Sequence, residues 1–416
     1  MKNNAFIKKS ISVLMCGFMG GIIAGIIWLF LKLLNTGISF VWEWTKETVH
    51  IPFYTIIVCL LGGLIIGIFQ KIFGSYPEEL ETVMGKVKKD KYYPYNNVFV
   101  ICIAALLPLL FGGSIGPEAG LTGVIVGLCY WVSDRIKYAD VYLKDITKIG
   151  LSSALGTIFG APLFGLVMPI EEKVDYDKEI TLSKFSKTIY IVVSVMSAFG
   201  VFSLLNSMFG GGIGMPHIEY AEITGKEQIF GIPLALVGVV FGVLYLLFDR
   251  FTKAFFTKLQ EKIGIVISTM LGGLILGVIG TYFPMTMFSG EESMGEIIVT
   301  YKEFAPWVLI VTGVLKLLVT NICIKSGWRG GHFFPVIFSG VSIGCALAIL
   351  TGLNYAFCIG VVTAGVLGVI MRKPFAVTLL LLLCFPLRVI PWLIIASFIG
   401  SIIPISRIIP SKKEID

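Results

Sequence analysis

Apolar runs recur from one end of this chain to the other, and they limit its possible folds more than any other feature of the sequence. Several approach the ~20 residues that a helix needs to cross the hydrocarbon core of a bilayer. Of the 416 residues, 56% are hydrophobic and only 14% are charged, whereas soluble domains usually carry about 25% charged residues. The sequence therefore predicts an all-α integral membrane protein of many helices. The clear runs cover residues 11–34, 52–72, 97–111, 119–132, 189–206, 231–248, 264–281, 306–323, 334–351, 355–370, 375–385 and 389–405.

Glycine and proline interrupt some of these runs, and the interruptions fall into two groups. Irregular backbone at membrane depth is tolerated only where it is buried in protein or lines a cavity. Paired interruptions in two halves of a chain are typical of a transporter repeat whose binding site lies near the midplane. We therefore expect a first membrane repeat over residues 1–206, a linker over 207–228, a second repeat over 229–405 and a tail over 406–416. The interruptions lie at residues 73–79, 112–120 and 159–165, and again at 327–340 and 372–376.

Loop charge predicts the orientation of the chain. Basic residues gather at the N-terminus, in loops at 86–91, 135–148 and 250–262, and in the tail, and the positive-inside rule assigns such loops to the cytoplasm. The linker is acidic instead, so we expect it on the outside. Because both termini are then cytoplasmic, each half crosses the membrane an odd number of times, and the two halves are inverted relative to each other.

Cysteine, histidine and charge argue against several other classes of protein. The eight cysteines stand singly within apolar runs and the three histidines are scattered, so we expect neither a metal site nor a disulfide framework. The net charge of +7 is not gathered into a long basic tract, which argues against a nucleic-acid partner. We expect no cofactor, and no enzymatic activity, because no catalytic constellation supports one.

The segment GGSIGPEAG at 112–120 carries the strongest candidate for an ion site. Pro117 suits the first turn of a helix, where its missing N–H costs nothing, and Glu118 then lies in that turn. Gly116 and Ala119 let the backbone approach a ligand closely. A helix start buried in a membrane has unpaired N–H groups and a partial positive charge, which an anion or a carboxylate satisfies. The alternative is a surface turn with an ordinary capping acid, but an acid between apolar residues is costly unless it is used.

A second candidate helix start lies in GWRGGHFFP at 327–335. Gly330 and Gly331 permit tight backbone approach, and Pro335 fits an early helical position. We expect the backbone N–H of His332, rather than its side chain, to face an anion. A flexible loop between helices is the alternative.

Three further polar features each allow more than one interpretation. The broken run at 159–172 ends at Glu171 and Glu172, which either mark a helix end in water or deliver protons towards the core. Ser75 can donate its O–H to an anion, although its neighbours are also typical of an ordinary turn. Lys316 lies inside an apolar run. It either draws anions inward or has a structural role, in which it pairs with an acid or extends its amine towards water.

Taken together, these segments resemble the CLC family of chloride channels and chloride/proton antiporters, in order and spacing and over nearly the whole chain. The resemblance implies a CLC-like fold of two inverted repeats with broken, tilted helices, and a homodimer with a separate pore in each subunit. It also implies the prokaryotic type, without C-terminal regulatory domains, in a bacterial plasma membrane. The matching elements are GSYPEE at 74–79, GPEAG at 116–120, APLFGLVMPIEE at 161–172 and GHFFP at 331–335.

By this resemblance, Glu118 is the external gating glutamate, which competes with the anion and takes up protons, and Glu172 is the internal proton-transfer glutamate. Four features depart from the family pattern: the first motif, at 74–79, is one residue shorter, and the motif at 116–120 ends in Gly120 instead of proline. The other two concern the ion path. Pro117 stands where the family has arginine, and the tyrosine that closes the family's inner gate has no match. The residues expected to bind the anion are Ser75, Gly116, Ala119, His332 and Phe333.

The expected function is transport of chloride or a similar small anion across the bilayer, coupled to proton antiport through Glu118 and Glu172. A passive, voltage- or pH-gated chloride channel of the same fold is the alternative. A fluoride-selective exchanger and a non-transporting membrane sensor are weaker alternatives.

Overall fold

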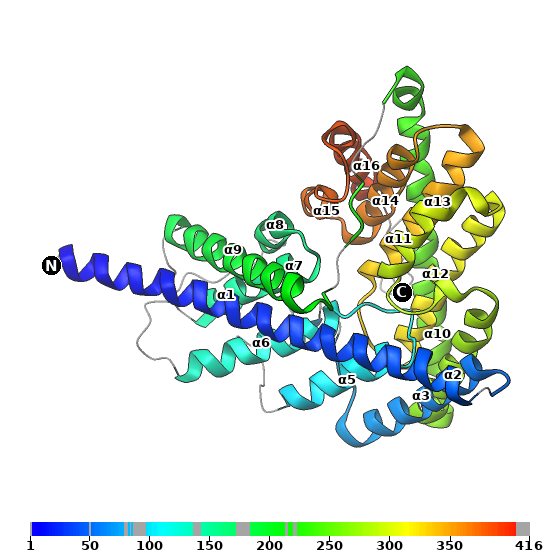
Figure 1. Ribbon diagram of the computed structural model, residues 1–416, viewed down its shortest axis with the longest axis horizontal. Helices are drawn as coiled ribbons and strands as arrows, with labels where there is room; N and C mark the ends of the chain where they lie inside the picture. Colours follow the sequence, from blue (N-terminus) through cyan, green and yellow to red (C-terminus); the bar gives the residue numbers. More distant parts are fainter. Residues whose placement is uncertain are drawn as a thin grey trace, which may run out of the picture.

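The computed structural model describes residues 2–49, 51–78, 82–83, 85, 97–135, 143–171, 184–212, 215–218 and 223–404. These residues form helices joined by turns and loops, so the all-α prediction is confirmed (Figure 1). The helices of the first part of the chain are α1 (Lys2–Ser39), η1 (Phe40–Trp44), α2 (Thr45–Val49), α3 (Tyr54–Phe73), α5 (Val98–Leu110), α6 (Glu118–Arg135), α7 (Leu143–Ile158), α8 (Pro162–Glu171) and α9 (Lys184–Phe209). The second part contains α10 (Gly225–Tyr282), η2 (Pro284–Thr286), α11 (Glu291–Thr300), η3 (Tyr301–Glu303), α12 (Pro306–Ser326), α13 (Phe333–Thr351), α14 (Tyr355–Met371), α15 (Pro374–Leu381), η4 (Leu387–Val389) and α16 (Ile390–Ile402).

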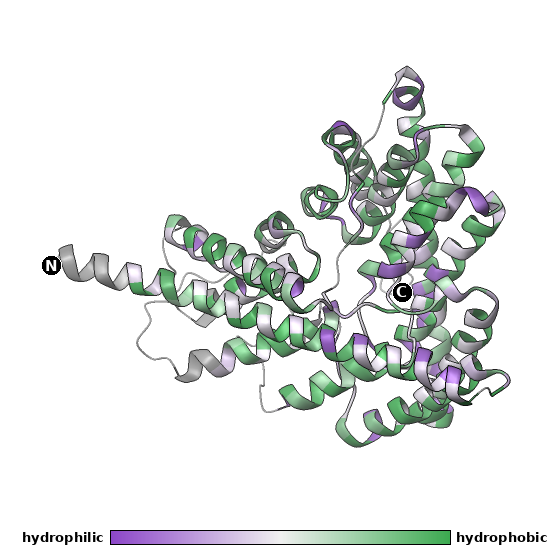
Figure 2. Ribbon diagram, viewed as in Figure 1, coloured by the Kyte–Doolittle hydropathy of each residue, from purple (hydrophilic) through white to green (hydrophobic). Residues whose placement is uncertain are grey.

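The outer surface of the molecule is apolar, as a bilayer requires. Among the described residues, six helices are long and apolar enough to cross a membrane. Large apolar side chains point outward from them and from the shorter helices, such as Phe18 on α1 and Phe99, which is 85% exposed, on α5. Figure 2 shows that hydrophobic residues make up most of these helices. In water such surface would drive association, so the chain is an integral membrane protein.

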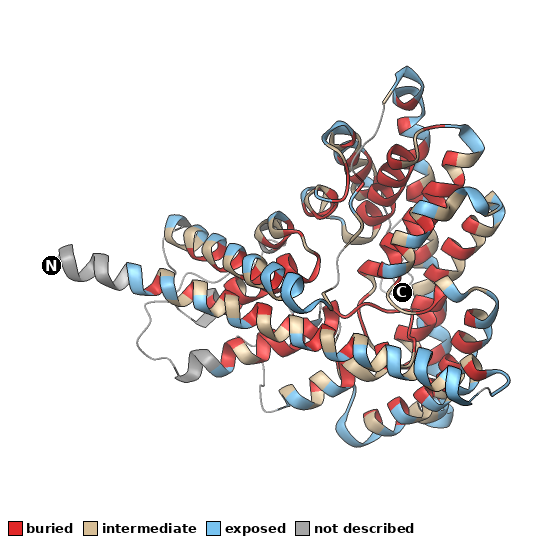
Figure 3. Ribbon diagram, in the orientation of Figure 1, coloured by how far each residue is buried: buried red, intermediate tan, exposed pale blue. Residues whose placement is uncertain are grey.

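The core lies around α13 and α14. In the most apolar stretch of α13, 83% of the residues are buried inside the protein, against 33% in the corresponding stretch of α1. Figure 3 shows this contrast. A helix that is apolar on every face belongs inside a protein or a membrane. The two helices approach closely because glycines of α13 lie against α14. A Cβ on Gly340 would lie 2.5 Å from the Thr363 hydroxyl oxygen, and one on Gly344 would lie 2.5 Å from the Ile359 Cα, as at other close helix contacts in membranes.

The predicted interruptions are confirmed. α3 ends at Phe73, α7 and α8 are separate helices, and α12 ends at Ser326 before α13 begins at Phe333. At the end of α12, Gly327 has a φ of 118°, a left-handed conformation that glycine adopts without steric cost and that commonly ends a helix.

One expected loop is helical instead. The runs 231–248 and 264–281 were expected as two spans with a basic loop between them. Within α10 two helices meet at Gly264, whose φ of 81° and ψ of 170° are not helical, but residues 250–262 belong to the first of these helices instead of forming a loop. The polar residues at 250–262 extend the helix beyond the apolar run, and the direction changes only at the glycine. The basic loop prediction at this position is therefore wrong.

The connection between the expected repeats is short. α9 ends at Phe209 and α10 begins at Gly225, close to the expected linker of 207–228. Within it, the Ile218 N–H donates to the Cys384 carbonyl (2.9 Å), so the connection lies along the second part of the chain. The inverted relation of the repeats and the side on which the linker lies stay predictions, and the tail from 405 onward lies outside the described residues.

Candidate functional site

Two of the broken segments, far apart in the chain, meet in the middle of the molecule. The Gly116 N–H donates to the Gly331 carbonyl and the Gly331 N–H to the Gly116 carbonyl, both at 2.8 Å, and the two residues form an antiparallel β-bridge. The bridge joins the loop before α6 to the loop before α13. It thereby places two helix starts, predicted separately as ion sites, next to each other.

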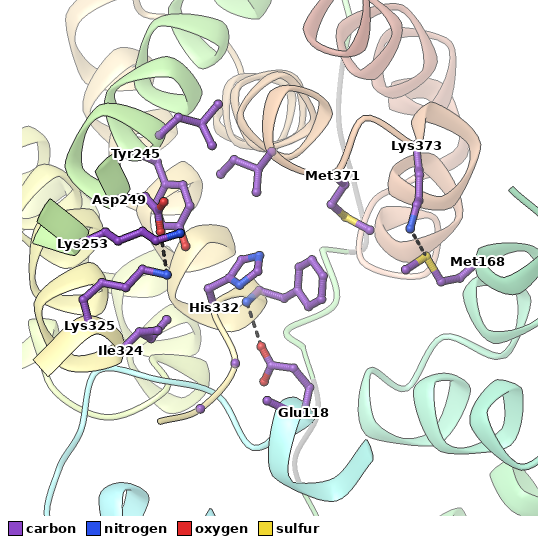
Figure 4. Close-up of a pocket in the computed structure, with 16 residues that line it drawn as sticks. Glu118, Met168, Tyr245, Asp249, Lys253, Ile324, Lys325, His332, Met371 and Lys373 are labelled. Atoms are coloured by element: carbon purple, nitrogen blue, oxygen red, sulfur yellow. Dashed lines mark hydrogen bonds and ion pairs between the residues drawn. The ribbon is translucent and has the colours of Figure 1, made fainter. Parts of the chain in front are cut away.

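Glu118 connects these helix starts. It is the first residue of α6 and only 1% exposed, and its Oε1 accepts a hydrogen bond from the Phe333 N–H at 2.8 Å. Figure 4 shows this carboxylate directed at the start of α13. The first N–H groups of a helix have no partner within the helix and carry partial positive charge. The carboxylate therefore occupies a place that would equally suit a small anion.

Glycine at 116 and 331 makes room for that carboxylate. A Cβ on Gly116 would lie 1.9 Å from the Glu118 Oε2, and one on Gly331 would lie 1.9 Å from the Glu118 Cδ. Neither position could accommodate a Cβ unless the Glu118 side chain moved. Gly116 was predicted to contact the anion, but its N–H is used in the bridge, so its visible contribution is this absence of a side chain.

A cavity of about 350 Å³ leads to Glu118 from one side. We call it the lysine cavity, because its wall includes Lys253, Lys325 and Lys373. Ala119, His332 and Phe333 also line it, so three of the predicted anion-binding residues lie where an anion in this cavity would meet them. Figure 4 shows Lys325 and Lys253 on the side opposite Glu118, with His332 between them.

A second cavity of about 260 Å³ lies on the other side of the bridge. We call it the acidic cavity, because Glu43, Glu291 and Glu292 line it, together with Pro117 and Phe288. Pro117 faces this cavity, whereas the next residue, Glu118, faces the lysine cavity. The start of α6 therefore forms part of the partition between the two cavities.

Glu291 is a candidate functional residue that the sequence analysis missed. It is the first residue of α11 and is buried, and its Oε1 accepts no hydrogen bond from the described residues. Glu291 and Pro117, the residue before Glu118, line the same cavity. Two adjacent acids after a glycine, in a short segment between apolar runs, are the signal that could have identified it.

Lys316 has none of the three predicted roles. Its ammonium is buried and donates hydrogen bonds to the carbonyls of Met285 (3.4 Å), Thr286 (3.2 Å), Met287 (2.7 Å) and Phe288 (2.8 Å). These carbonyls belong to η2 and the residues that follow it, and Phe288 lines the acidic cavity. Lys316 therefore shapes the wall of that cavity and does not face an ion in either cavity.

We expect Lys316→Met to destabilise the protein, because it leaves a group of buried carbonyls without a donor. Each buried acceptor left unsatisfied costs about 1–3 kcal/mol. The measurement is thermal unfolding in detergent, followed by the loss of the monodisperse peak in size-exclusion chromatography. Lys302→Met, at an exposed position, is the control. An unfolding midpoint equal to that of the control would mean that these bonds contribute nothing.

The remaining predicted residues are not brought to Glu118. Ser75 is exposed in the turn after α3 and lines neither cavity, so its role stays a prediction without geometric support. Glu172 lies outside the described residues, and its role also stays a prediction. The preceding acid, Glu171, accepts hydrogen bonds from the N–H groups of Phe375 (3.2 Å) and Ala376 (2.7 Å), so it caps the start of α15 and ties α8 to it.

Comparisons with known proteins agree with this architecture. The sequence profile of the family described as "Voltage gated chloride channel" matches residues 62–404. The "Putative ion-transport protein YfeO" of Escherichia coli O17:K52:H18 is 21% identical over 325 residues, which cover 76% of this chain and 74% of that protein. The protein of the same name from Escherichia fergusonii matches to the same extent.

Solved structures share the fold. A slow cyanobacterial Cl⁻/H⁺ antiporter superposes with a TM-score of 0.78 at 16% identity, over 97% of this chain and 95% of that one. A CLC-type fluoride/proton antiporter superposes with a TM-score of 0.73 at 18% identity, over 94% and 95%. The profile match covers most of the sequence, and the helix arrangement matches that of CLC antiporters. This chain therefore belongs to the voltage-gated chloride channel (CLC) family of ion-transporting membrane proteins.

Proposed function

We propose that the protein moves chloride or a similar small anion between the lysine cavity and the acidic cavity in exchange for protons, and that Glu118 is the group for which both ions compete. The observation that carries this proposal is the hydrogen bond from the Phe333 N–H to the Glu118 Oε1 (2.8 Å). An anion that reaches the start of α13 from the lysine cavity needs the same N–H. It can have this donor only after the carboxylate has left.

Protonation favours that exchange. Hydrogen bonds to a charged carboxylate are roughly twice as strong as those between neutral groups, so a neutral Glu118 holds the Phe333 N–H less tightly. An anion that takes the carboxylate's place in turn favours the protonated side chain, because two negative charges at one site repel each other. Proton uptake and anion binding at the start of α13 are therefore linked, and this linkage is what an exchanger needs.

The proton route in this proposal runs through the acidic cavity on one side. Glu291 is buried in the wall of that cavity, and its Oε1 accepts no hydrogen bond from the described residues; we assign it the transfer of protons between the cavity and Glu118. On the opposite side we retain Glu172 as the expected proton-transfer acid.

Glu291→Gln should therefore slow proton movement roughly tenfold or more while the anion still passes, because a positioned acid or base contributes at least that much to proton transfer. The measurement is proton uptake into liposomes under an anion gradient. Glu296→Gln, at an exposed position on the same helix, is the matched control. Proton uptake at the wild-type rate in Glu291→Gln would remove Glu291 from the route.

A passive anion channel is the second candidate. It is favoured by the presence of a cavity on each side of the partition at the start of α6, since the departure of the Glu118 side chain would bring the two cavities close to joining.

The identity of the anion is also part of the proposal. Chloride is our first choice and fluoride the second, since both anions appear among the structures that share this fold.

The experiment that tests transport itself is anion efflux from liposomes. Purified protein is reconstituted in vesicles loaded with potassium chloride or potassium fluoride, valinomycin is added to carry potassium, and an ion-selective electrode records the anion. We expect protein-dependent efflux of at least one of the two anions. Absence of efflux for both chloride and fluoride would contradict both the exchanger and the channel.

A further inference from the structure

The lysine cavity contains an ion pair that transport through Glu118 does not require. The Lys325 Nζ lies 2.9 Å from the Asp249 Oδ1, and their side chains are 17% and 36% exposed. Both residues line the cavity, and Figure 4 shows the pair across from His332 and Glu118. A carboxylate in the wall of a cavity that admits anions needs an explanation, because its charge repels them.

The pair lies where the cavity passes from solvent into protein. Along α10, Asp249 has Lys253 one turn after it and Tyr245 one turn before it, and residues four apart share a helix face. Lys253 is exposed and Tyr245 is buried, with its ring centroid 5.8 Å from that of His332. An anion that moves from the Lys253 end towards Glu118 therefore passes Asp249 and Lys325 first.

Lys325 is well placed to attract that anion. It is the second-last residue of α12, directly before the loop that leads to Gly331 and the Phe333 N–H. Water is partly excluded there, so a single positive charge acts on an anion more strongly than it would in bulk solvent. Asp249 cancels much of this charge. A partly exposed ion pair adds little to stability, so holding the fold together is a weak reason for its presence.

We propose that Asp249 sets the affinity of the lysine cavity for its anion by neutralising Lys325, so that the anion is attracted but is also released. This inference rests on the proposed anion transport and goes beyond it, because it names the residues that determine the working concentration range. A tightly held anion would leave slowly, and an ion path needs binding that is weak enough for release. The residual attraction comes from Lys253, at the exposed end of the cavity.

The test is the anion concentration that gives half-maximal transport, measured in liposomes at low ionic strength for wild type, Asp249→Asn, Lys325→Gln and the double variant. We expect Asp249→Asn to lower this concentration roughly three- to tenfold and Lys325→Gln to raise it by a similar factor, because each removes one charge from the pair. The double variant should return close to wild type. Lys302→Gln is the control for loss of a distant lysine, and added inert salt should shrink the differences.

A purely structural ion pair would not shift the half-maximal anion concentration in opposite directions in the two single variants, so the directions of these shifts distinguish the two explanations. If both single variants shift the concentration in the same direction, or if neither shifts it, the proposal is overturned. Should Asp249→Asn fail to fold in detergent, Asp249→Ser makes the same charge change with a smaller side chain. Wild-type protein that moves no anion would instead disprove the proposed function, and this inference with it, whereas wild-type flux with an unshifted Asp249→Asn disproves the inference alone.

Discussion

Glu118→Gln is expected to keep anion movement while abolishing the proton movement that accompanies it. Glutamine has nearly the shape of glutamate, so it fits between Gly116 and Gly331, but it carries no charge and cannot take up and release a proton. In wild type the Glu118 carboxylate holds the Phe333 N–H at 2.8 Å. A neutral amide holds it less tightly, so the anion gains access to the start of α13 without needing a proton.

The measurement records anion efflux and external pH in the same vesicle suspension. Proton uptake should fall to the level of protein-free liposomes, while anion efflux stays within roughly tenfold of wild type, since only one hydrogen-bonding group has changed. Glu296→Gln, on the exposed face of α11, serves as the matched control and should behave like wild type. Coupled proton uptake that survives in Glu118→Gln would show that another acid carries the proton.

Gly331→Ala is the second change with a large expected effect. The added Cβ would lie 1.9 Å from the Glu118 Cδ and 2.0 Å from its Oε1, closer than any non-bonded contact allows. The φ of Gly331 is not positive, so the backbone accepts alanine without strain. The side chain of Glu118, as the flexible partner, has to move, and it loses the Phe333 N–H. We expect the fold to persist and the coupling to fail.

Misplacement of a reacting group by ~1 Å can cost about 100-fold in rate, and we expect proton movement per anion to fall by a factor of that order. Gly295→Ala is the control, because nothing lies within 4 Å of its added Cβ. The same vesicle assay applies, together with a thermal unfolding midpoint to show that the variant is folded. Normal coupling in folded Gly331→Ala would mean that the position of Glu118 described here is not the one used in transport.

Several features of the site were predictable from the sequence because their causes are local. Long apolar runs require a bilayer, and glycine and proline at 327–335 and before Glu118 end one helix and begin another. A buried acid in the first turn of a helix is costly unless it is used. These arguments identified Glu118 and the start of α13 separately, and the structure places them in contact.

Other features depend on contacts between distant segments, and local patterns do not reveal them. Lys316 could not be assigned to the carbonyls of 285–288, since nothing in an apolar helix shows which loop folds back over it. Glu291 stands in a local pattern of two acids after a glycine, but that pattern does not show that the side chain is buried in the wall of a cavity. Ser75 shows the limit of motif reasoning in another way: its hydroxyl lies in a suitable motif but is exposed and lines neither cavity, so its role stays a prediction.

The central claim is that one site, at Glu118, serves both the anion and the proton, and uphill proton movement tests it most directly. Wild-type protein is reconstituted in liposomes with equal pH on both sides and a steep gradient of the transported anion, chloride or fluoride, and both ions are recorded. Our account predicts that protons move in the direction opposite to the anion, build up a pH gradient, and continue uphill until that gradient balances the gradient of the anion. Anion flux with no net proton movement would contradict it and would leave a passive channel.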